Sequence, residues 1–417
     1  MTHADGIERE EERAPRRLGK VPALDGLRAI AVLLVVIVHF RRALAPWASQ
    51  YVYAPAFAES LANATGRSLD GYVLMAKEIT NPVLRLLFPD GGFLGVDIFF
   101  VLSGFLITAL MLREASVRGR VRVGAFYRRR ALRLLPALFA YIAAQMVYAG
   151  AIGVSWQVER RSMTSVVFYY FNWNLIHELP EVPPAIAHLW SLSVEEQFYL
   201  VWPLLTMFVV GIRHRLPTVV AVLGGCVLAI AAWRWLLLEH HNAGIVYFRT
   251  DARADSLLVG ALAAHLWVRR RTPSPALIRA LAWPALAFIV YCVERYESTD
   301  PFLARGGFTI IAIAVAIVLL AAIDTDWSFG RVLRWAPLRG VGRVSYGLYL
   351  WHVLAFGIAG LMRTSPATLR MATGLALMVA MTATSWYVVE LPFLRWKDRL
   401  EARLPAQERA LDQVPRR

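Results

Sequence analysis

Long apolar runs recur along the whole chain and are separated by short polar stretches. A membrane-spanning helix needs about 20 mostly apolar residues, because the hydrocarbon core of a bilayer is about 30 Å thick. About ten runs approach this length, with approximate ranges 24–44, 92–112, 131–151, 196–212, 217–238, 254–268, 276–293, 307–323, 344–362 and 369–390. The pattern therefore predicts an all-α fold, a polytopic membrane bundle of about ten transmembrane helices.

A shorter apolar stretch, 163–176, is assigned from the charges of the loops around it. Cytoplasmic loops of membrane proteins carry an excess of Lys and Arg. The loops 239–251 and 294–305 are less basic and are expected outside. A full span at 163–176 would invert this pattern, so we expect a short re-entrant or interfacial helix there and both termini in the cytoplasm. The basic stretches expected in the cytoplasm are 113–133, 213–215, 269–271, 331–343 and the tail after Arg395.

The chain divides into one membrane domain and two short tails. Residues 1–20 are charged and polar, with no visible signal peptide, and are expected to form a cytoplasmic N-terminal tail. The membrane domain covers 21–395, and residues 396–417 form a cytoplasmic C-terminal tail. The segment 45–91 joins the first two spans outside the membrane and is expected to contain an interfacial helix.

The composition is that of a membrane protein, and the positive net charge can be explained by membrane topology. The chain has 417 residues, 58% of them hydrophobic, and a mean hydropathy of +0.48, which is unusual for a soluble protein. The net charge is +15, and its arginines lie mostly in short loops, which topology and anionic lipid explain without nucleic acid. Cys226 and Cys292 lie inside apolar runs and are expected in the core rather than in a disulfide or metal site.

The first span carries an arginine near one end and a histidine near the other. In a helix, Arg28 and His39 are close to three turns apart, so both lie on one face roughly 16 Å from each other. Charge at membrane depth is costly unless it faces protein or water, so this arrangement predicts a polar interior. The imidazole of His39 suits general-base catalysis, and a histidine hydrogen-bonded between helices is the structural alternative.

The second span contains an aspartate and several glycines. Asp97 lies in an otherwise apolar run, where the structural interpretation is an ion pair or hydrogen bond to a neighbouring helix. Gly92, Gly95 and Gly104 predict close helix packing. Ser103 is not a convincing nucleophile, because no base lies near it in the sequence.

Arg130 and Arg133 are one turn apart at the cytoplasmic end of the third span. Guanidinium groups bind phosphate oxygens with matching geometry, so the pair could hold a phosphorylated substrate. The alternative is that these arginines only set the topology of the membrane helices.

Glu195 and Glu196 are expected at the start of a span on the outer side, with Ser193 as its cap. The structural interpretation is that carboxylates in a first turn favour the helix dipole. The functional interpretation pairs one of them with an imidazole or with the acceptor.

Two further stretches carry polar residues in apolar surroundings. Arg253 and Asp255 face different sides of a helix, which favours polar packing at a helix end over a position lining a cavity. Tyr346, Tyr349 and His352 follow one broad helix face, where an aromatic belt at the membrane interface is the structural alternative.

Several stretches, in order, resemble the acyltransferase-3 family of integral membrane acyltransferases and extend from residue 21 to about 390. They are Arg28-x10-His39, GVDIFFVLSGFLIT, RRRALR, HLWSLSVEEQFYLVWP, RADSLLVG and SYGLYLWH. The resemblance implies a ten-span bundle that moves an acyl group from cytoplasmic acyl-CoA, expected to be acetyl-CoA, to a hydroxyl of a sugar-containing acceptor. Such acceptors are surface polysaccharides, lipopolysaccharide and glycosylated small molecules.

The same resemblance assigns roles to individual residues. His39 matches the essential histidine of the family and would act as general base. Glu195 fits the acidic position, with the neighbouring glutamate as the alternative, so the expected catalytic residues are His39 and Glu195. Arg28 matches the partner arginine, and Arg130 and Arg133 match a basic motif, so these three are expected to bind acyl-CoA. No metal is expected.

The leading hypothesis is therefore an O-acyltransferase of the bacterial cytoplasmic (inner) membrane that contacts membrane lipid, acyl-CoA and a carbohydrate or glycoside. Direct transfer and a transient acyl-histidine both remain open. A transporter or flippase for a glycan precursor is the rival hypothesis, because intramembrane Arg, His and Asp are also typical of transport pathways. A third hypothesis is a membrane sensor that binds acyl-CoA or lipid without turnover. Some relatives carry a fused extracytoplasmic hydrolase-like domain, which is expected to be absent here.

Overall fold

The computed structural model describes residues 21–44, 89–177, 184–208, 214–362 and 364–402, and these form helices and connecting turns without a strand. Seven helical stretches are long and apolar enough to cross a membrane. They are Pro22–Phe40, Asp90–Arg118, Val123–Ala151, Leu216–His240, Pro275–Arg295, Leu303–Asp324 and Thr368–Leu400. The expected all-α membrane bundle is confirmed.

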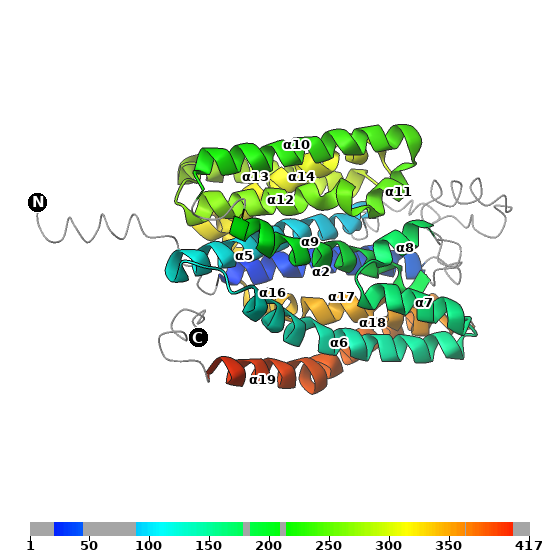
Figure 1. Ribbon diagram of the computed structural model, residues 1–417. Coiled ribbons are helices and arrows are strands. Elements are labelled where there is room, and N and C mark those ends of the chain that lie inside the picture. The colour runs from blue at the N-terminus through cyan, green and yellow to red at the C-terminus, as the bar shows by residue number, and fades with distance from the viewer. Residues whose placement is uncertain (1–20, 45–88, 178–183, 209–213, 363, 403–417) are drawn as a thin grey trace, which may run out of the picture.

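The helices that make up these stretches are α2 (Pro22–Leu44), α5 (Gly95–Arg118), α6 (Val123–Ala151), α10 (Leu216–His240), α13 (Pro275–Arg295), α14 (Phe308–Asp324) and α18 (Ala367–Thr384). Three shorter or more polar helices run alongside them within the bundle, as Figure 1 shows. These are α9 (Trp190–Phe208), α12 (Thr250–Val268) and α17 (Ser345–Gly360).

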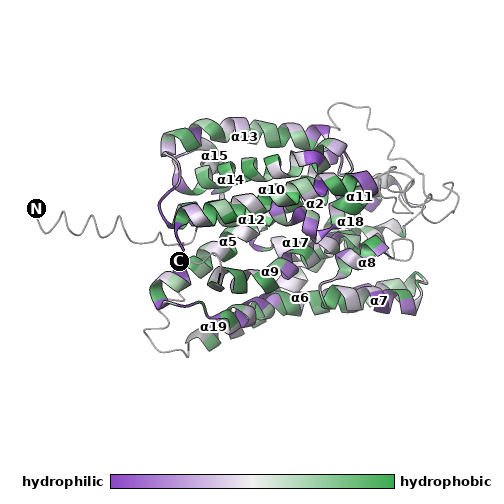
Figure 2. Cartoon of the chain, turned by 45° about the horizontal axis from the view of Figure 1, so that its top comes forward, coloured by the Kyte–Doolittle hydropathy of each residue, from purple (hydrophilic) through white to green (hydrophobic). Residues whose placement is uncertain are grey.

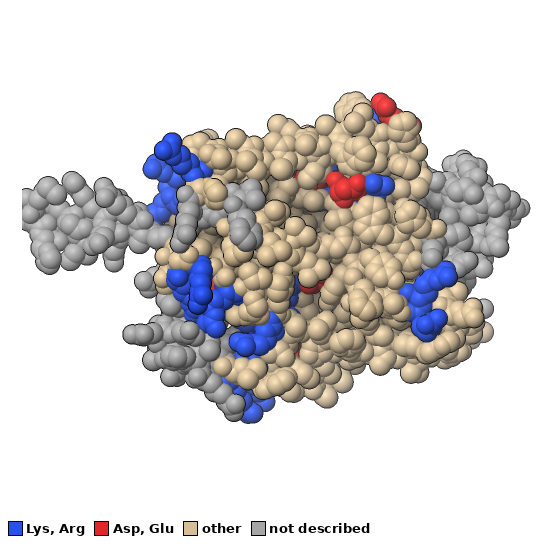
Figure 3. Space-filling view, viewed as in Figure 1, with Lys and Arg blue, Asp and Glu red and all other residues tan. Residues whose placement is uncertain are grey.

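The two ends of the bundle carry different short elements. α2 begins and α19 (Leu391–Ala402) ends at one end, which we call the terminal end; α7, α8 and α11 lie at the other, which we call the opposite end (Figure 1). Lys and Arg side chains gather mainly at the terminal end of the face in Figure 3. The remaining elements are η2 (Asp90–Leu94), α7 (Trp156–Val167), α8 (Phe171–His177), η3 (Pro184–Leu189), α11 (Ala243–Phe248), η4 (Leu303–Gly307), α15 (Ser328–Leu333), α16 (Ala336–Arg343) and η5 (Ser385–Glu390).

Apolar residues lie both in the core and on the outside of the bundle, where the helices are largely hydrophobic (Figure 2). On α10, Leu228 is 71% exposed, and on α18, Val379 is 59% exposed. Exposed apolar side chains are expected where helices face lipid rather than water. Cys226 also lies exposed on α10, so its expected core position is wrong, whereas Cys292 is buried as expected.

Close backbone contacts between helices depend on glycine. A methyl group added at Gly104 of α5 would lie 1.9 Å from the carbonyl oxygen of Leu257 in α12, and one at Gly260 would lie 2.1 Å from that of Val101. Side chains therefore cannot be accommodated where α5 and α12 cross. Gly95 meets the Ala31 carbonyl of α2 in the same way, and the predicted role of these glycines in close packing is confirmed.

The ambiguous stretch 163–176 is divided between α7 and α8, which meet at a break around Tyr169, where φ is 56°. Helices of 12 and 7 residues are too short to cross a bilayer, which agrees with the expected short re-entrant or interfacial helix. The expected N-terminal tail 1–20 lies outside the described residues, as does the segment 45–91 with its expected interfacial helix, apart from its last three residues. Of the expected C-terminal tail 396–417, residues 396–402 are described and belong to α19.

The start of α9 differs from the sequence-based expectation. The helix begins at Trp190, directly after η3, so Ser193 lies inside the helix and does not cap it. Glu195 and Glu196 consequently lie beyond the first turn, and their interpretation as partners of the helix dipole is wrong. The sequence gives no sign of this early start because the polar residues that usually mark a helix terminus here lie within the helix.

Candidate functional site

Three histidines from distant parts of the sequence lie together inside the bundle. The ring centroids of His39 and His352 are 4.9 Å apart, those of His188 and His352 are 5.0 Å apart, and those of His39 and His188 are 6.4 Å apart. We call these residues the histidine cluster. They are supplied by α2, η3 and α17, and His188 and His352 are buried.

The backbone fixes the tautomer of two of these rings. Nδ1 of His39 lies 2.8 Å from the carbonyl oxygen of Val35, which can only accept, so Nδ1 carries the hydrogen and Nε2 keeps a lone pair. Nδ1 of His352 donates in the same way to the carbonyl of Tyr349 at 2.8 Å. Nε2 of His352 is buried and has no hydrogen-bond partner among the described residues.

Sequence reasoning found only one member of this cluster. The sequence places His352 with Tyr346 and Tyr349 in a candidate aromatic belt at the membrane interface, but the structure buries His352 and Tyr349 in the bundle, so the belt interpretation is wrong for both. His188 received no role. The sequence does carry one signal for these residues, because ionisable side chains in apolar membrane segments are rare and often functional. That signal is the same for all three histidines and does not show that they meet.

A pocket opens beside the histidine cluster at the opposite end of the bundle. It encloses about 700 Å³, open mouth included, and His39 and His188 contribute to its wall. Its other walls come from η2, the starts of α5 and α9, α11, the loop after α13 and Tyr349 of α17. α11, which forms one of these walls, lies at the opposite end (Figure 1), so the pocket lies toward that end.

Tyr349 fixes the position of α17 against this pocket. Its hydroxyl donates a hydrogen bond to the backbone carbonyl of His188 and lies 2.6 Å from the hydroxyl of Ser191. All three residues are buried. The hydrogen bonds therefore hold η3 and α9 to α17, and with them the relative positions of His188 and His352.

Glu195 is placed with a serine rather than with a histidine. The Ser103 hydroxyl of α5 donates a hydrogen bond to the Glu195 carboxylate, and the Tyr199 hydroxyl lies 3.3 Å from the same oxygen. The expected pairing of Glu195 with an imidazole is therefore not among its hydrogen bonds. Ser103, which has no basic residue near it in the sequence, has this carboxylate beside it in the fold.

Glu196 forms an ion pair with Arg130. The guanidinium donates from Nη2 to one carboxylate oxygen at 2.6 Å and from Nε to the other at 3.0 Å. It also lies 3.2 Å from the centre of the Tyr199 ring. Two-point contacts of this kind give a fixed geometry, so Arg130 is held in place by the protein itself.

The other two candidate arginines lie near Arg130. Arg133 is exposed and experiences electrostatic repulsion from both Arg28 and Arg130, so positive charge from α2 and α6 converges there. We call Arg28, Arg130 and Arg133 the arginine cluster. Arg28 also lies 3.7 Å from Asp25. Like charges that the fold brings together favour an anionic ligand.

Glu390 is a further charged residue that sequence reasoning missed. Its carboxylate attracts Arg133 electrostatically and accepts a hydrogen bond of 3.1 Å from Ser385. Both belong to η5, a π-helical segment that interrupts the last long helix. Such segments are rare and are frequent at functional sites. The sequence shows no signal for this change of helix geometry.

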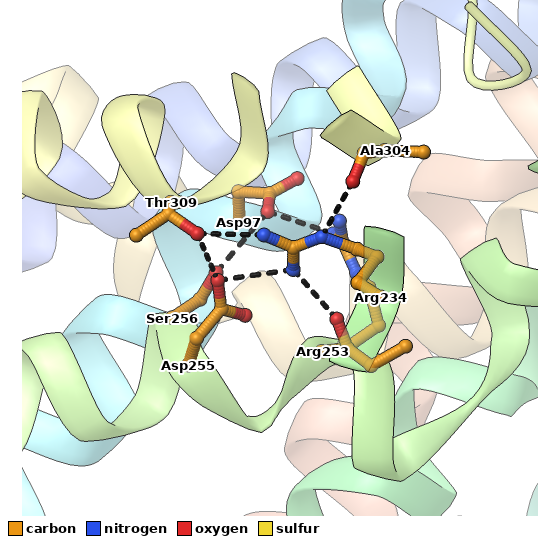
Figure 4. Close-up of polar contacts among 8 residues, drawn as sticks. Asp97, Arg234, Arg253, Asp255, Ser256, Ala304 and Thr309 are labelled. Atoms are coloured by element: carbon orange, nitrogen blue, oxygen red, sulfur yellow. Dashed lines mark hydrogen bonds and ion pairs between the residues drawn. The ribbon is translucent and has the colours of Figure 1, made fainter. Parts of the chain in front are cut away.

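A separate group of buried charges joins α5, α10 and α12, as Figure 4 shows. Arg253 donates to Asp97 at 2.7 Å, and Arg234 of α10 donates to Asp255 at 3.0 Å, with all four side chains 0% exposed. The structural interpretation of Asp97 as an ion-pair partner is confirmed. Arg253 and Asp255 are expected from the sequence to pack with polar groups at a helix end. In the structure each forms an ion pair between helices, Arg253 from α12 to α5 and Asp255 from α12 to α10.

This buried network also contacts the pocket. The Arg253 guanidinium lies 3.6 Å from the centre of the Phe308 ring and 5.2 Å from that of Tyr247, which lines the pocket. A buried cation above an aromatic ring is attracted to it. Arg253 therefore holds a wall of the pocket without facing its interior.

Comparison with known proteins identifies relatives that match most of this chain. YrhL of Bacillus subtilis (strain 168) is 32% identical over 350 residues, 80% of this chain and 48% of YrhL. The peptidoglycan O-acetyltransferase OatA of Listeria monocytogenes is 30% identical over 352 residues, 80% of this chain and 49% of OatA. The O-acetyltransferase OatA of Staphylococcus aureus is 28% identical over 359 residues, 82% of this chain and 51% of OatA.

The chain thus spans about half the length of these relatives, and no solved structure matches it. A family model described as an acyltransferase domain matches residues 21–390. The match runs from α2 through η5 and includes the histidine cluster, the arginine cluster and the buried ion pairs. Because it covers most of the chain, the protein belongs to the acyltransferase-3 family.

Proposed function

We propose that this chain is a membrane O-acyltransferase that moves an acyl group, with acetyl as the expected one, from acyl-CoA to a hydroxyl of a carbohydrate acceptor. Membership of the acyltransferase-3 family and the similarity to the two OatA O-acetyltransferases support the reaction class. The observation that carries the proposal is the position of His39. It lines an open pocket, and with its hydrogen on Nδ1 the neutral ring carries on Nε2 the lone pair that a general base uses.

In this proposal the two substrates arrive from opposite ends. The arginine cluster would bind the phosphates of CoA, because guanidinium groups form paired hydrogen bonds with phosphate. Lys and Arg gather mainly at the terminal end, which supports placing that end in the cytoplasm, where acyl-CoA is made. The acceptor would enter through the pocket beside His39.

The transfer step then follows ordinary acyl chemistry. His39 Nε2 takes the proton of the acceptor hydroxyl as its oxygen bonds to the thioester carbon. The carbon–sulfur bond breaks, and the imidazolium returns the proton to the leaving thiolate, giving the ester and free CoA. Glu195 would act through Ser103 and Tyr199, to which it is hydrogen-bonded, rather than through His39.

The test is transfer of labelled acetyl from acetyl-CoA by the purified full chain, with muropeptides and neutral oligosaccharides as acceptors. His39→Gln should lower transfer by about 10²–10⁴-fold, the usual contribution of a general base, at an unchanged unfolding temperature. His177→Gln, at an exposed position in α8, is the control and should keep normal transfer. A folded His39→Gln protein with normal turnover would contradict the proposal, as would glycan transport without any transfer from acetyl-CoA.

A further inference from the structure

The pocket beside His39 has a wall whose composition is informative about its ligand. Aromatic side chains line it from three elements: Phe93 of η2, Trp190 of α9, and Tyr247 of α11. The hydroxyls of Ser298 and Thr299 line it from the loop after α13. An apolar pocket with a few placed polar groups is the usual form of a small-molecule site.

Charge is missing from this wall in the part of the chain that the structure describes. No Asp, Glu, Lys or Arg side chain among the described residues lines the pocket. Glu297 and Asp300 flank the two hydroxyl residues in the sequence without lining it, and Asp300 accepts a hydrogen bond from the backbone of Phe302. The described wall thus offers no cation to an anionic ligand, and the buried Arg253 behind Tyr247 is already paired with Asp97.

These features differ from those of the arginine cluster. A nucleotide thioester needs cations for its phosphates, and the described wall of the pocket supplies none. A sugar ring needs an aromatic face for its weakly positive C–H groups, and hydroxyl partners for its own hydroxyls, and this wall supplies both. The two groups of residues therefore suit two different substrates.

We infer that the pocket is the acceptor subsite and that it takes an uncharged pyranose ring, with the aromatic wall as platform and the loop bearing Ser298 and Thr299 as the specificity element. This inference rests on the proposed function, since His39 is the base at its edge. It adds that anionic sugars such as uronic acids are poor ligands, and that residues of the loop after α13 decide this selectivity.

Direct binding tests the inference without requiring turnover. Methyl β-glucoside and methyl β-glucuronide differ only at C6, where a carboxylate replaces the hydroxymethyl group, and their binding to the purified full chain can be titrated by saturation-transfer NMR. Wild-type protein should bind the glucoside about tenfold more tightly than the glucuronide. Equal binding of the two, or no binding of the glucoside, would overturn the inference.

Three variants connect this binding to the loop. Ser298→Trp should fill the mouth of the pocket and weaken glucoside binding about tenfold or more. Ser328→Trp, at an exposed position at the terminal end, is the matched control and should not change it. Ser298→Arg should shift the preference toward the glucuronide, because it supplies a cation for the carboxylate. If both Ser298 variants bind like wild type, the pocket is not the acceptor subsite.

A parallel assay of acetyl transfer separates this inference from the proposed function. If the glucoside binds as expected but no acceptor receives acetyl from acetyl-CoA, the proposed function fails and the assignment of the pocket stands. If transfer occurs and Ser298→Trp leaves the KM for the acceptor unchanged, the proposed function stands and the assignment of the pocket fails.

Discussion

At the scale of single residues, the backbone decides which ring nitrogen of His39 can react. The carbonyl of Val35 holds the hydrogen on Nδ1, and the ring of His352 lies 4.9 Å away in an edge-on arrangement. His352 is itself held by the backbone of its own helix through Nδ1. The edge-on contact therefore places a second imidazole, with its own lone pair on Nε2, beside the proposed base.

We therefore expect His352→Phe to slow the chemical step rather than to weaken binding. The phenyl ring keeps the approximate volume of the imidazole but lacks Nε2, which has no hydrogen-bond partner among the described residues. Transfer should fall about tenfold in kcat with an unchanged KM for acetyl-CoA. Initial rates at varied acetyl-CoA measure both. A raised KM with normal kcat would instead indicate a substrate-binding role.

The arginine cluster yields a contrast between two neighbouring residues. Arg130 is locked to Glu196 by two hydrogen bonds, whereas Arg133 is exposed and repelled by its neighbours. Arg133→Ala should raise the KM for acetyl-CoA about tenfold at constant stability, because it removes a cation available to phosphate. Arg130→Ala should also lower the free energy of unfolding by about 2 kcal/mol, because Glu196 loses its partner.

Steady-state kinetics and thermal unfolding in detergent separate these two effects. Arg128→Ala, at an exposed position on the same helix, serves as the control for a change of charge alone. If Arg133→Ala lowers the unfolding temperature as much as Arg130→Ala does and leaves KM unchanged, the arginine cluster is structural.

At the scale of elements, glycine positions decide how closely helices approach. The α5–α12 contact brings Asp97 within 2.7 Å of Arg253, and this distance requires that no side chain lies between the backbones at Gly104 and Gly260. The same contact therefore determines both the packing and the buried ion pair. The position of Tyr247 beside Arg253, and hence a wall of the pocket, depends on it as well.

Gly104→Ala should therefore destabilise the protein by about 1–3 kcal/mol, the usual cost of overpacking, because its methyl group would lie 1.9 Å from the Leu257 carbonyl. Gly124→Ala in α6 is the matched control, since a methyl group there meets no atom within 4 Å. That change should be neutral or slightly stabilising because alanine favours helix. Thermal unfolding of both variants measures the difference, and equal effects would contradict the packing argument.

At the scale of the whole molecule, the fold separates a basic end from an end that carries the pocket. The arginine cluster and the histidine cluster both involve α2, which passes from the terminal end toward the opposite end. One helix thus supplies a residue to each half of the proposed reaction. This arrangement works only if the two ends face different compartments.

Cysteine labelling in intact bacterial cells tests that orientation. In a background with Cys226 and Cys292 replaced by alanine, Ser298→Cys should react with a membrane-impermeant maleimide, and Ser328→Cys should react only after the cells are opened. The reverse pattern would place the terminal end outside and would remove the expected cytoplasmic access for acyl-CoA. Full-length protein on gels provides the check that both variants insert.

The order of the membrane helices and several chemical positions follow from the sequence, because hydrophobic length and charge are local properties. The apolar runs correspond to seven described stretches that are long and apolar enough to span and to three shorter or more polar helices, and the packing glycines stand out in the same way. His39 and the arginine cluster are recognisable because charged and polar groups are rare at membrane depth.

Only the tertiary structure decides which of these groups meet. The pairs Ser103–Glu195, Arg130–Glu196 and Asp97–Arg253 join residues from separate helices, and nothing in the local sequence distinguishes Glu195 from Glu196. The histidine cluster likewise combines residues from three segments, α2, η3 and α17, and the hydrophobic pattern of each segment does not indicate that the three meet. Local sequence determines where a helix lies and which face is polar, but contacts between helices depend on packing across the whole bundle, and these contacts define the site.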